Sequence, residues 1–330
     1  TNCGSQASVV DKLINLQKRP EFIVMPGDLL DCPTAPAGDV NPLHFPAVRD
    51  IWGNLIDGLE EQSIPVADGL GNHDLWIGFG GENVKGDIQQ RNKKRIAEGS
   101  LFLPYGISTA DNAANYGNKG YHYTWFFPLE KNGKKVLVAF FMLNNLPGNA
   151  NRTDPGDTGH CHDEGTYAFG ALDYLKASMQ TMACMPGYDY MVGIPMFHIN
   201  YGCDVNGDTH GNPERWWTYA DKKALKDVLD KAPIKIVTAF FGHEHVRSIE
   251  KQTLYIGDRK DPANKTEYSG YRCACSIDKP RLNIIDLELV EENGHCKIKI
   301  TPRFIEVAKL TSTDDCLPMI KEELQSCIEL

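Results

Sequence analysis

The sequence lacks any long hydrophobic run. Its longest apolar stretch, residues 136–143, is far shorter than the ~20 residues that a helix needs to cross a bilayer, and its length is typical of a strand. The N-terminus carries no signal peptide, and the C-terminus carries no hydrophobic tail. We therefore expect no membrane span and no lipid or peptide anchor, and we interpret the chain as a mature or trimmed form.

Positive charge is also scarce. The chain has 34 Lys and Arg residues against 44 Asp and Glu residues, which gives a formal net charge of -10 at pH 7. This balance argues against non-specific binding to nucleic acid or to an anionic membrane surface, because both attract basic proteins. The short basic run at residues 91–95 lies in a polar helical pattern, so we interpret it as a solvated face.

No Cys-x-x-Cys pair occurs among the 10 cysteines, which are scattered along the chain. The pattern favours disulfides over a zinc site, although it does not define their connectivity. N-glycosylation sequons begin at Asn151 and Asn264. Together these features predict a secreted, extracellular or lumenal protein.

Repeats and obvious linkers are absent too, so we predict a single domain over residues 1–330. Helical patterns alternate with short, continuous apolar strands, which is typical of α/β proteins whose sheets are covered on both faces. The predicted helices are residues 5–17, 45–59, 86–98, 171–182, 221–231 and 315–327. The predicted strands are residues 21–25, 64–67, 121–127, 135–143, 190–194, 234–241, 282–290 and 296–304. Asn132-Gly133 predicts a tight hairpin turn between two of them.

Short polar motifs follow several of these strands. They are Gly27-Asp28, Gly71-Asn72-His73-Asp74, the single His198, and Gly242-His243-Glu244-His245. Taken singly, each has an ordinary explanation as a turn, a helix cap or a core histidine. Because ligands of open α/β sheets bind at the carboxyl ends of strands, the ordered series predicts one shared site.

This series resembles the calcineurin-like metallophosphoesterase superfamily. Over residues 5–250 the motifs and their spacing are most similar to the small, mammalian-type purple acid phosphatases. The resemblance implies an α/β fold arranged as a four-layer α/β/β/α sandwich, with two mixed sheets flanked by helices. It also implies two metal ions, of Fe, Zn or Mn, and a small phosphate ester as substrate.

The resemblance extends to individual positions. It implies metal ligands at Asp28, which would bridge the two ions, and at Asn72, His198, His243 and His245. His73 would stabilise the phosphoryl oxygens or protonate the leaving group, and Asp74 would orient it. The implied reaction is hydrolysis of a phosphate ester by a metal-bridging hydroxide.

The sequence departs from the family pattern in two places. Asp31 stands where the purple enzymes carry a tyrosine, so we expect no purple colour even with iron bound. No Asp-x-His motif precedes Gly27, and the nearest acid, Asp11, lies in a helical pattern. We expect that the sequence starts after the first strand of the domain. The alternative is that the first metal site is absent and only one ion binds.

The leading interpretation is an acid phosphatase-like hydrolase of extracellular phosphomonoesters. A phosphodiesterase is one alternative. A second alternative is a non-catalytic scaffold of the same fold that binds a protein partner, which the missing ligands support. Retention of Asn72, His73, His198, His243 and His245 argues against the scaffold, because a decayed site tends to lose such residues.

Overall fold

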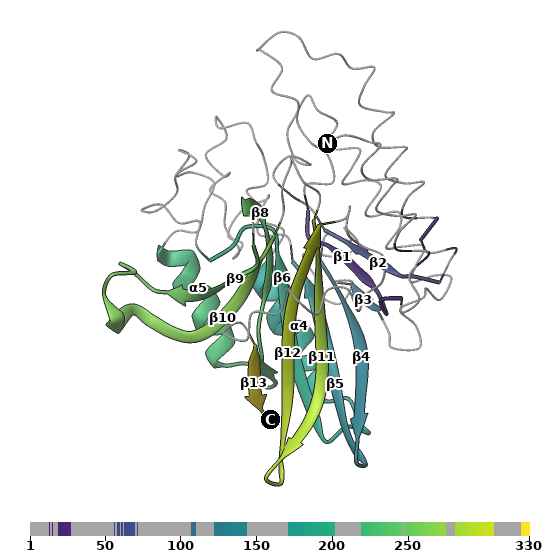
Figure 1. Cartoon of the computed structure of the whole chain (residues 1–330). Coiled ribbons are helices and arrows are strands. Elements are labelled where there is room, and N and C mark those ends of the chain that lie inside the picture. The colour runs from purple at the N-terminus through teal and green to yellow at the C-terminus, as the bar shows by residue number, and fades with distance from the viewer. Residues whose placement is uncertain are drawn as a thin grey trace, which may run out of the picture.

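A computed structural model describes most of the central and C-terminal chain (Figure 1). The described residues are 13, 15, 19–27, 56, 58, 59, 61, 63–69, 71, 107–109, 122–143, 171–201, 219–246, 248–274, 281–306 and 325–330. The predicted helix at 86–98 and most of those at 5–17 and 315–327 lie outside them. Within this part of the chain, no helix combines the length and apolar character needed to cross a membrane.

The largest sheet is mixed and has 8 strands. Its order is β3 (Ile107–Thr109), β4 (Tyr123–Lys131), β5 (Lys134–Met142), β6 (Tyr190–Phe197), β8 (Phe240–Val246), β10 (Lys265–Ala274) and β9 (Glu250–Tyr255), with β7 (Lys235–Ile236) on β6. The inner strands β5, β6, β8 and β10 are parallel, and the outer strands add antiparallel pairs. The carboxyl ends of the parallel strands therefore share one edge.

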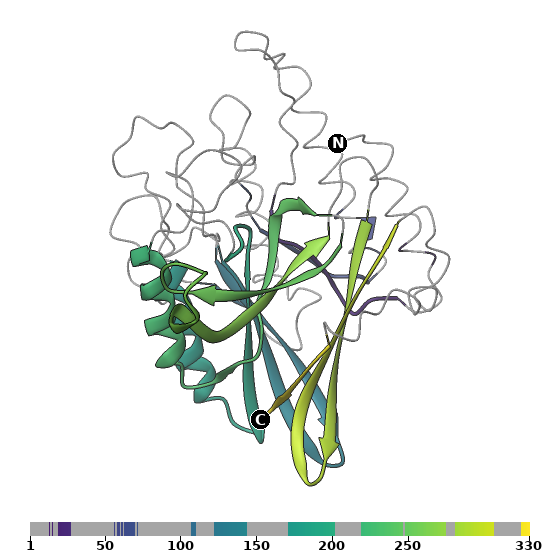
Figure 2. The same ribbon diagram turned by 60° about the vertical axis from the view of Figure 1, so that its left-hand side comes forward.

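In the part of the chain that the structure describes, two helices cover one face of this sheet. They are α4 (Ala171–Ala183) and α5 (Tyr219–Asp230), which lie together on one side of the sheet in Figure 2. Alternation along β5 explains why, because Leu137, Ala139 and Phe141 point to the helices while the residues between them point to the opposite face.

Further strands pack on the other face of the sheet. They are β1 (Ile23–Met25), β2 (Val66–Asp68), β11 (Arg281–Glu292), β12 (His295–Glu306) and β13 (Ser326–Glu329). Phe22 and Val24 join the inner core with Trp125 and Phe140, and Leu289 approaches it from β11. β1 and β2 form a parallel pair, and β11, β12 and β13 form an antiparallel sheet.

A third core lies on the outer side of these strands. Ile23 and Val66 point outward there and pack against the buried helical residues Leu13, Ile56 and Leu59. Helices, large sheet, smaller sheets and outer helical residues thus follow one another in layers. This arrangement confirms the predicted α/β sandwich of sheets flanked by helices.

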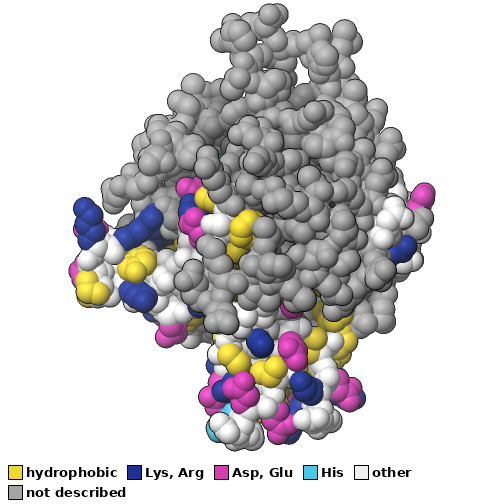
Figure 3. All heavy atoms as spheres, viewed as in Figure 1, with side chains coloured by type: hydrophobic (Ala, Val, Ile, Leu, Met, Phe, Trp, Pro, Cys, Tyr) yellow, Lys and Arg dark blue, Asp and Glu magenta, His cyan; other side chains and the backbone are white. Residues whose placement is uncertain are grey.

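The hairpin predicted at Asn132-Gly133 is confirmed. β4 and β5 pair up to Lys131 and Lys134, and the turn residues have φ values of 51° and 76°. Both values lie in the left-handed region that a two-residue hairpin turn of this type requires. Charged side chains of both signs gather at the hairpin ends (Figure 3), where Lys131 lies 3.4 Å from Glu288 of β11.

Replacing Gly133 with alanine is expected to lower the free energy of unfolding by about 1–2 kcal/mol, because a Cβ is disfavoured at positive φ. An added Cβ would meet no atom within 4 Å at this position, so backbone strain is the cause. Gly58 is the matched control. It is helical and equally open, so Gly58→Ala is expected to stabilise by about 0.5–1 kcal/mol. Urea unfolding checks both changes, and equal shifts would contradict the expectation.

Two predicted elements were wrong in detail. The strand predicted at 234–241 is two strands, because β6 pairs with Ile236 through Gly193 and with Phe240 through Met196. The chain from Ile236 to Phe240 is therefore one residue longer than the stretch of β6 that it faces, as in a β-bulge. The end of the helix predicted at 315–327 was also wrong, since Cys327 lies in β13 and pairs with Lys299.

Candidate functional site

The carboxyl ends of β1, β2 and β6 and the first residues of β8 meet at one edge of the layers. The backbone N–H of Gly69, just after β2, donates to the carbonyl of Met25 at 2.8 Å. A Cβ placed on Gly242 would lie 3.2 Å from Nδ1 of His198 and 3.4 Å from Cγ of Pro26. Glycine at position 242 therefore permits a close approach of three strand ends, as a shared site requires.

His198 and His243 are in direct contact at this edge. Nδ1 of His243 lies 3.3 Å from Nε2 of His198, and the ring centroids are 5.1 Å apart in an edge-to-face arrangement. His198 follows the buried strand β6 and is itself only 1% exposed. The N–H of Gly242 also donates to the carbonyl of His198 at 3.1 Å, which fixes the two backbones.

The spacing of the two imidazole nitrogens fits a shared metal ion. Two histidine nitrogens at about 2.0–2.1 Å from a tetrahedral zinc ion lie about 3.3 Å apart, the separation that the pair already has. Imidazole also suits Fe and Mn sites when carboxylate or amide oxygens complete the coordination. Within the described residues, no group of three His, Cys, Asp or Glu side chains could hold a metal. The pair therefore needs further ligands.

His243 has an unusual backbone conformation. Its φ is 69°, in the left-handed region, although it is not a glycine. Such residues cluster at functional sites, because the surrounding structure must hold them against a cost of roughly 1–3 kcal/mol. The pairing of β8 with β6 ends at Phe241, so His243 stands where the two strands separate, and β8 continues along β10. The sequence predicted that the motif Gly242-His243-Glu244-His245 follows the strand. This was wrong, because the motif lies within β8.

A network of hydrogen bonds adjoins the histidine pair. Nδ2 of the buried Asn200 donates to Oε2 of Glu244 at 2.9 Å. Arg272 of β10 contacts the same carboxylate and also Glu250 of β9. Burial lowers the pKa of the Arg272 guanidinium, but the hydrogen bonds and charges of Glu250 and Glu244 raise it more, and the net effect is a raised pKa. Arg272 is therefore a permanent cation beside the site.

The structure brings together part of the predicted site. His198 and His243 are adjacent, and the backbone of His245 lies in β8 three residues beyond Gly242. Asp28, Asn72, His73 and Asp74 lie outside the described residues, so their roles stay predictions. Their described neighbours in the sequence, Gly27 and Gly71, follow β1 and β2, which end at the same edge.

Sequence reasoning missed Asn200, Glu244 and Arg272. The one available signal was the position of Glu244 between two motif histidines. Because successive side chains of a strand point to opposite faces, Glu244 was expected to point away from both histidines. Nothing in the sequence indicated that Asn200, 44 residues away, would donate to that carboxylate.

The features that suggested a secreted protein are only partly described. Asn264 lies in the short helical turn η4 (Pro262–Asn264), and its Nδ2 donates to the carbonyl of Asp258 at 3.0 Å. The thiols of Cys184, Cys296 and Cys327 are free in the described structure. Asn151 and the remaining cysteines apart from Cys273 lie outside the described residues, so glycosylation and disulfides elsewhere stay predictions.

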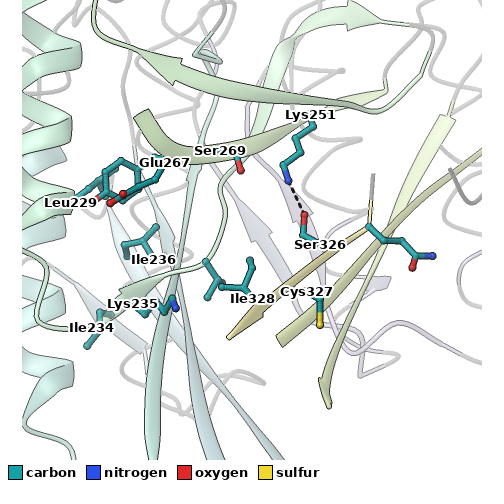
Figure 4. A pocket seen from close by; sticks show the side chains of 13 residues that line it. Leu229, Ile234, Lys235, Ile236, Lys251, Glu267, Ser269, Ser326, Cys327 and Ile328 are labelled. Carbon is teal, nitrogen blue, oxygen red and sulfur yellow. Dashed lines mark hydrogen bonds between the residues drawn. The ribbon is translucent and has the colours of Figure 1, made fainter. Parts of the chain in front are cut away.

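A separate groove of about 740 Å³ lies between α5, β7, β10 and β13 (Figure 4). Its walls include Leu229, Ile236 and Ile328, and Nζ of Lys251 donates to Oγ of Ser326 at 3.0 Å within it. None of the predicted site residues that the structure describes lines this groove. The histidine pair is therefore the better candidate site.

Comparisons with known proteins were made at the level of sequence and of structure. A scan against protein-family models and a search of curated proteins found no match. A solved structure described as "GAP50 the anchor in the inner membrane complex of Plasmodium" aligns with a TM-score of 0.46 and 14% sequence identity, over 100% of this chain and 85% of its own. At that level of similarity the family assignment stays a prediction from the motifs.

Proposed function

We propose that the chain is a metal-dependent phosphoric ester hydrolase, acting like an acid phosphatase on small extracellular or lumenal phosphomonoesters. The observation that carries the proposal is the contact of His198 and His243, with their ring nitrogens 3.3 Å apart at the meeting point of the strand ends. A contact between residues 45 positions apart, at the place where the motifs predicted a metal site, supports a built site.

The donor set suits a pair of hard or borderline metal ions. His198, His243 and Asn72 would hold one ion, His245 the other, and the Asp28 carboxylate would bridge them. Such a pair lowers the pKa of a bound water enough to give hydroxide near neutral pH. It also supplies the local positive charge that a chain of net charge -10 needs to attract an anionic substrate.

The protein's own side chains would complete the reaction. His73 would donate a proton to the leaving alkoxide, a contribution of about 10²–10⁴-fold, and Asp74 would hold its ring in the productive orientation. The buried His198 would keep its ligand nitrogen in place, because its backbone carbonyl is bonded to the N–H of Gly242.

The first test is metal analysis of the purified protein together with a nitrophenyl phosphate assay. We expect bound Fe, Zn or Mn, turnover of the monoester, and loss of both after treatment with a chelator. Bis-nitrophenyl phosphate tests the phosphodiesterase alternative, and we expect the monoester to react faster. A protein that takes up none of these metals and stays inactive when they are added would contradict the proposal.

A further inference from the structure

Asn200, Glu244 and Arg272 tie together the elements that carry the histidine pair. Asn200 lies two residues after His198, and Glu244 follows His243 directly. The 2.9 Å hydrogen bond from Asn200 to Glu244 therefore joins the two segments a second time, next to the histidine contact. Arg272 extends the connection from β8 to β10.

The environment makes these bonds strong. Asn200 is fully buried, and the side chains of Arg272 and Glu244 are only 16% and 19% exposed. A carboxylate that accepts from a buried amide and a guanidinium forms charge-assisted bonds, and breaking one leaves a poorly solvated polar group behind. Removing the side chain of either Asn200 or Glu244 is therefore expected to lower the free energy of unfolding.

The backbone of His243 explains why such a network is needed. A histidine at φ 69° is held there by its surroundings, and the next residue in the chain is Glu244. With its carboxylate fixed from two sides, Glu244 restricts the peptide that joins it to His243. The direction of the His243 ring then depends on a residue that does not itself face His198.

We propose that Asn200, Glu244 and Arg272 form a bracket that holds the imidazoles of His198 and His243 at ligand spacing, with Glu244 as a positioning residue rather than a metal ligand. The metal-binding consequence rests on the proposed function. The positioning of the two rings is a claim about the metal-free protein. The two claims are therefore separable by experiment.

Glu244→Ala is the test variant, and Glu250→Ala is its matched control. Glu250 contacts the same guanidinium, but it is 46% exposed and makes no contact with Asn200 in the described structure. In the full chain without metal, ¹⁵N-edited imidazole NMR spectra are expected to change for His198 and His243 in Glu244→Ala and to stay as in wild type in Glu250→Ala. The thermal unfolding of both variants is measured alongside.

Zn(II) titration of the same proteins gives the second readout. Loss of groups that orient metal ligands typically weakens affinity 10–100-fold, so we expect a Kd increase of about that size in Glu244→Ala and of less than about 3-fold in Glu250→Ala. Asn200→Ala should also raise Kd, and the double variant Asn200→Ala/Glu244→Ala should add little to Glu244→Ala alone, because that change already removes the hydrogen bond from Asn200.

Glu244→Gln keeps the side-chain volume and serves if Glu244→Ala does not fold. Its neutral amide removes the charge that strengthens the bond from Arg272, so its spectra and Kd should shift in the same direction. Histidine signals in both folded Glu244 variants that match those of Glu250→Ala would overturn the bracket. If wild type binds none of Zn, Fe and Mn, the proposed function is contradicted, and the metal-free spectra still decide the bracket.

Discussion

Replacing His243 with alanine is expected to weaken Zn(II) binding and to reduce phosphomonoester turnover by at least about 100-fold. The change removes one of the two imidazoles that meet at 3.3 Å, and even residues that only orient a metal ligand typically contribute 10–100-fold. Metal titration and kinetics on the purified variant measure both effects. Asn72→Ala should behave in the same way if Asn72 is a ligand.

Two controls separate loss of the imidazole from general damage. His243→Asn keeps a residue type that tolerates φ 69°, so its stability should stay near wild type while its metal affinity falls. His295→Ala removes an exposed histidine that pairs with Glu329 at 2.7 Å, and it should change neither property. Wild-type turnover in both His243→Ala and Asn72→Ala would exclude the proposed site.

Replacing Trp125 with alanine is expected to reduce the free energy of unfolding by about 3–5 kcal/mol, the usual cost of truncating a large buried aromatic residue. Trp125 of β4 is fully buried between the sheet layers. Its ring stacks on Phe140 at 5.3 Å and meets Phe22, before β1, edge-on at 5.8 Å. It therefore connects the large sheet to the strands that lead into the site.

Urea denaturation of Trp125→Ala, followed by circular dichroism, measures this loss. Trp125→Phe keeps an aromatic ring in the same layer and should lose clearly less stability than Trp125→Ala. A cost below about 1 kcal/mol for the alanine variant would mean that the layers do not depend on this contact.

Much of the fold could be predicted because local signals agreed with the tertiary structure. Asn132-Gly133 between two apolar runs defines a hairpin, and the spacing of Leu172, Leu175 and Met179 defines the buried face of α4. The break between β7 and β8 could not be predicted in this way. The segment 234–241 is mostly apolar and contains no Gly or Pro that marks a break, and the extra residue is visible only against the register of β6.

The candidate site, like the fold, could be predicted only in part from the sequence. His198 and His243 could be placed together because each follows an apolar run predicted as a strand, and parallel strands of an α/β sheet end at one edge. The partnership of Asn200 with Glu244 depends on side-chain direction, which the positive φ of His243 changes locally. No spacing rule for strands includes that change, so the bracket became visible only in three dimensions.

The order of strands around the histidine pair has a kinetic consequence. His198 and His243 stand on β6 and β8, and the crossover between these parallel strands contains α5. Contacts that require a crossover form late, because loop-closure entropy is spent before they are made. The two imidazoles therefore come together only when β6 and β8 pair, so assembly of the histidine contact depends on closure of the chain segment that carries α5.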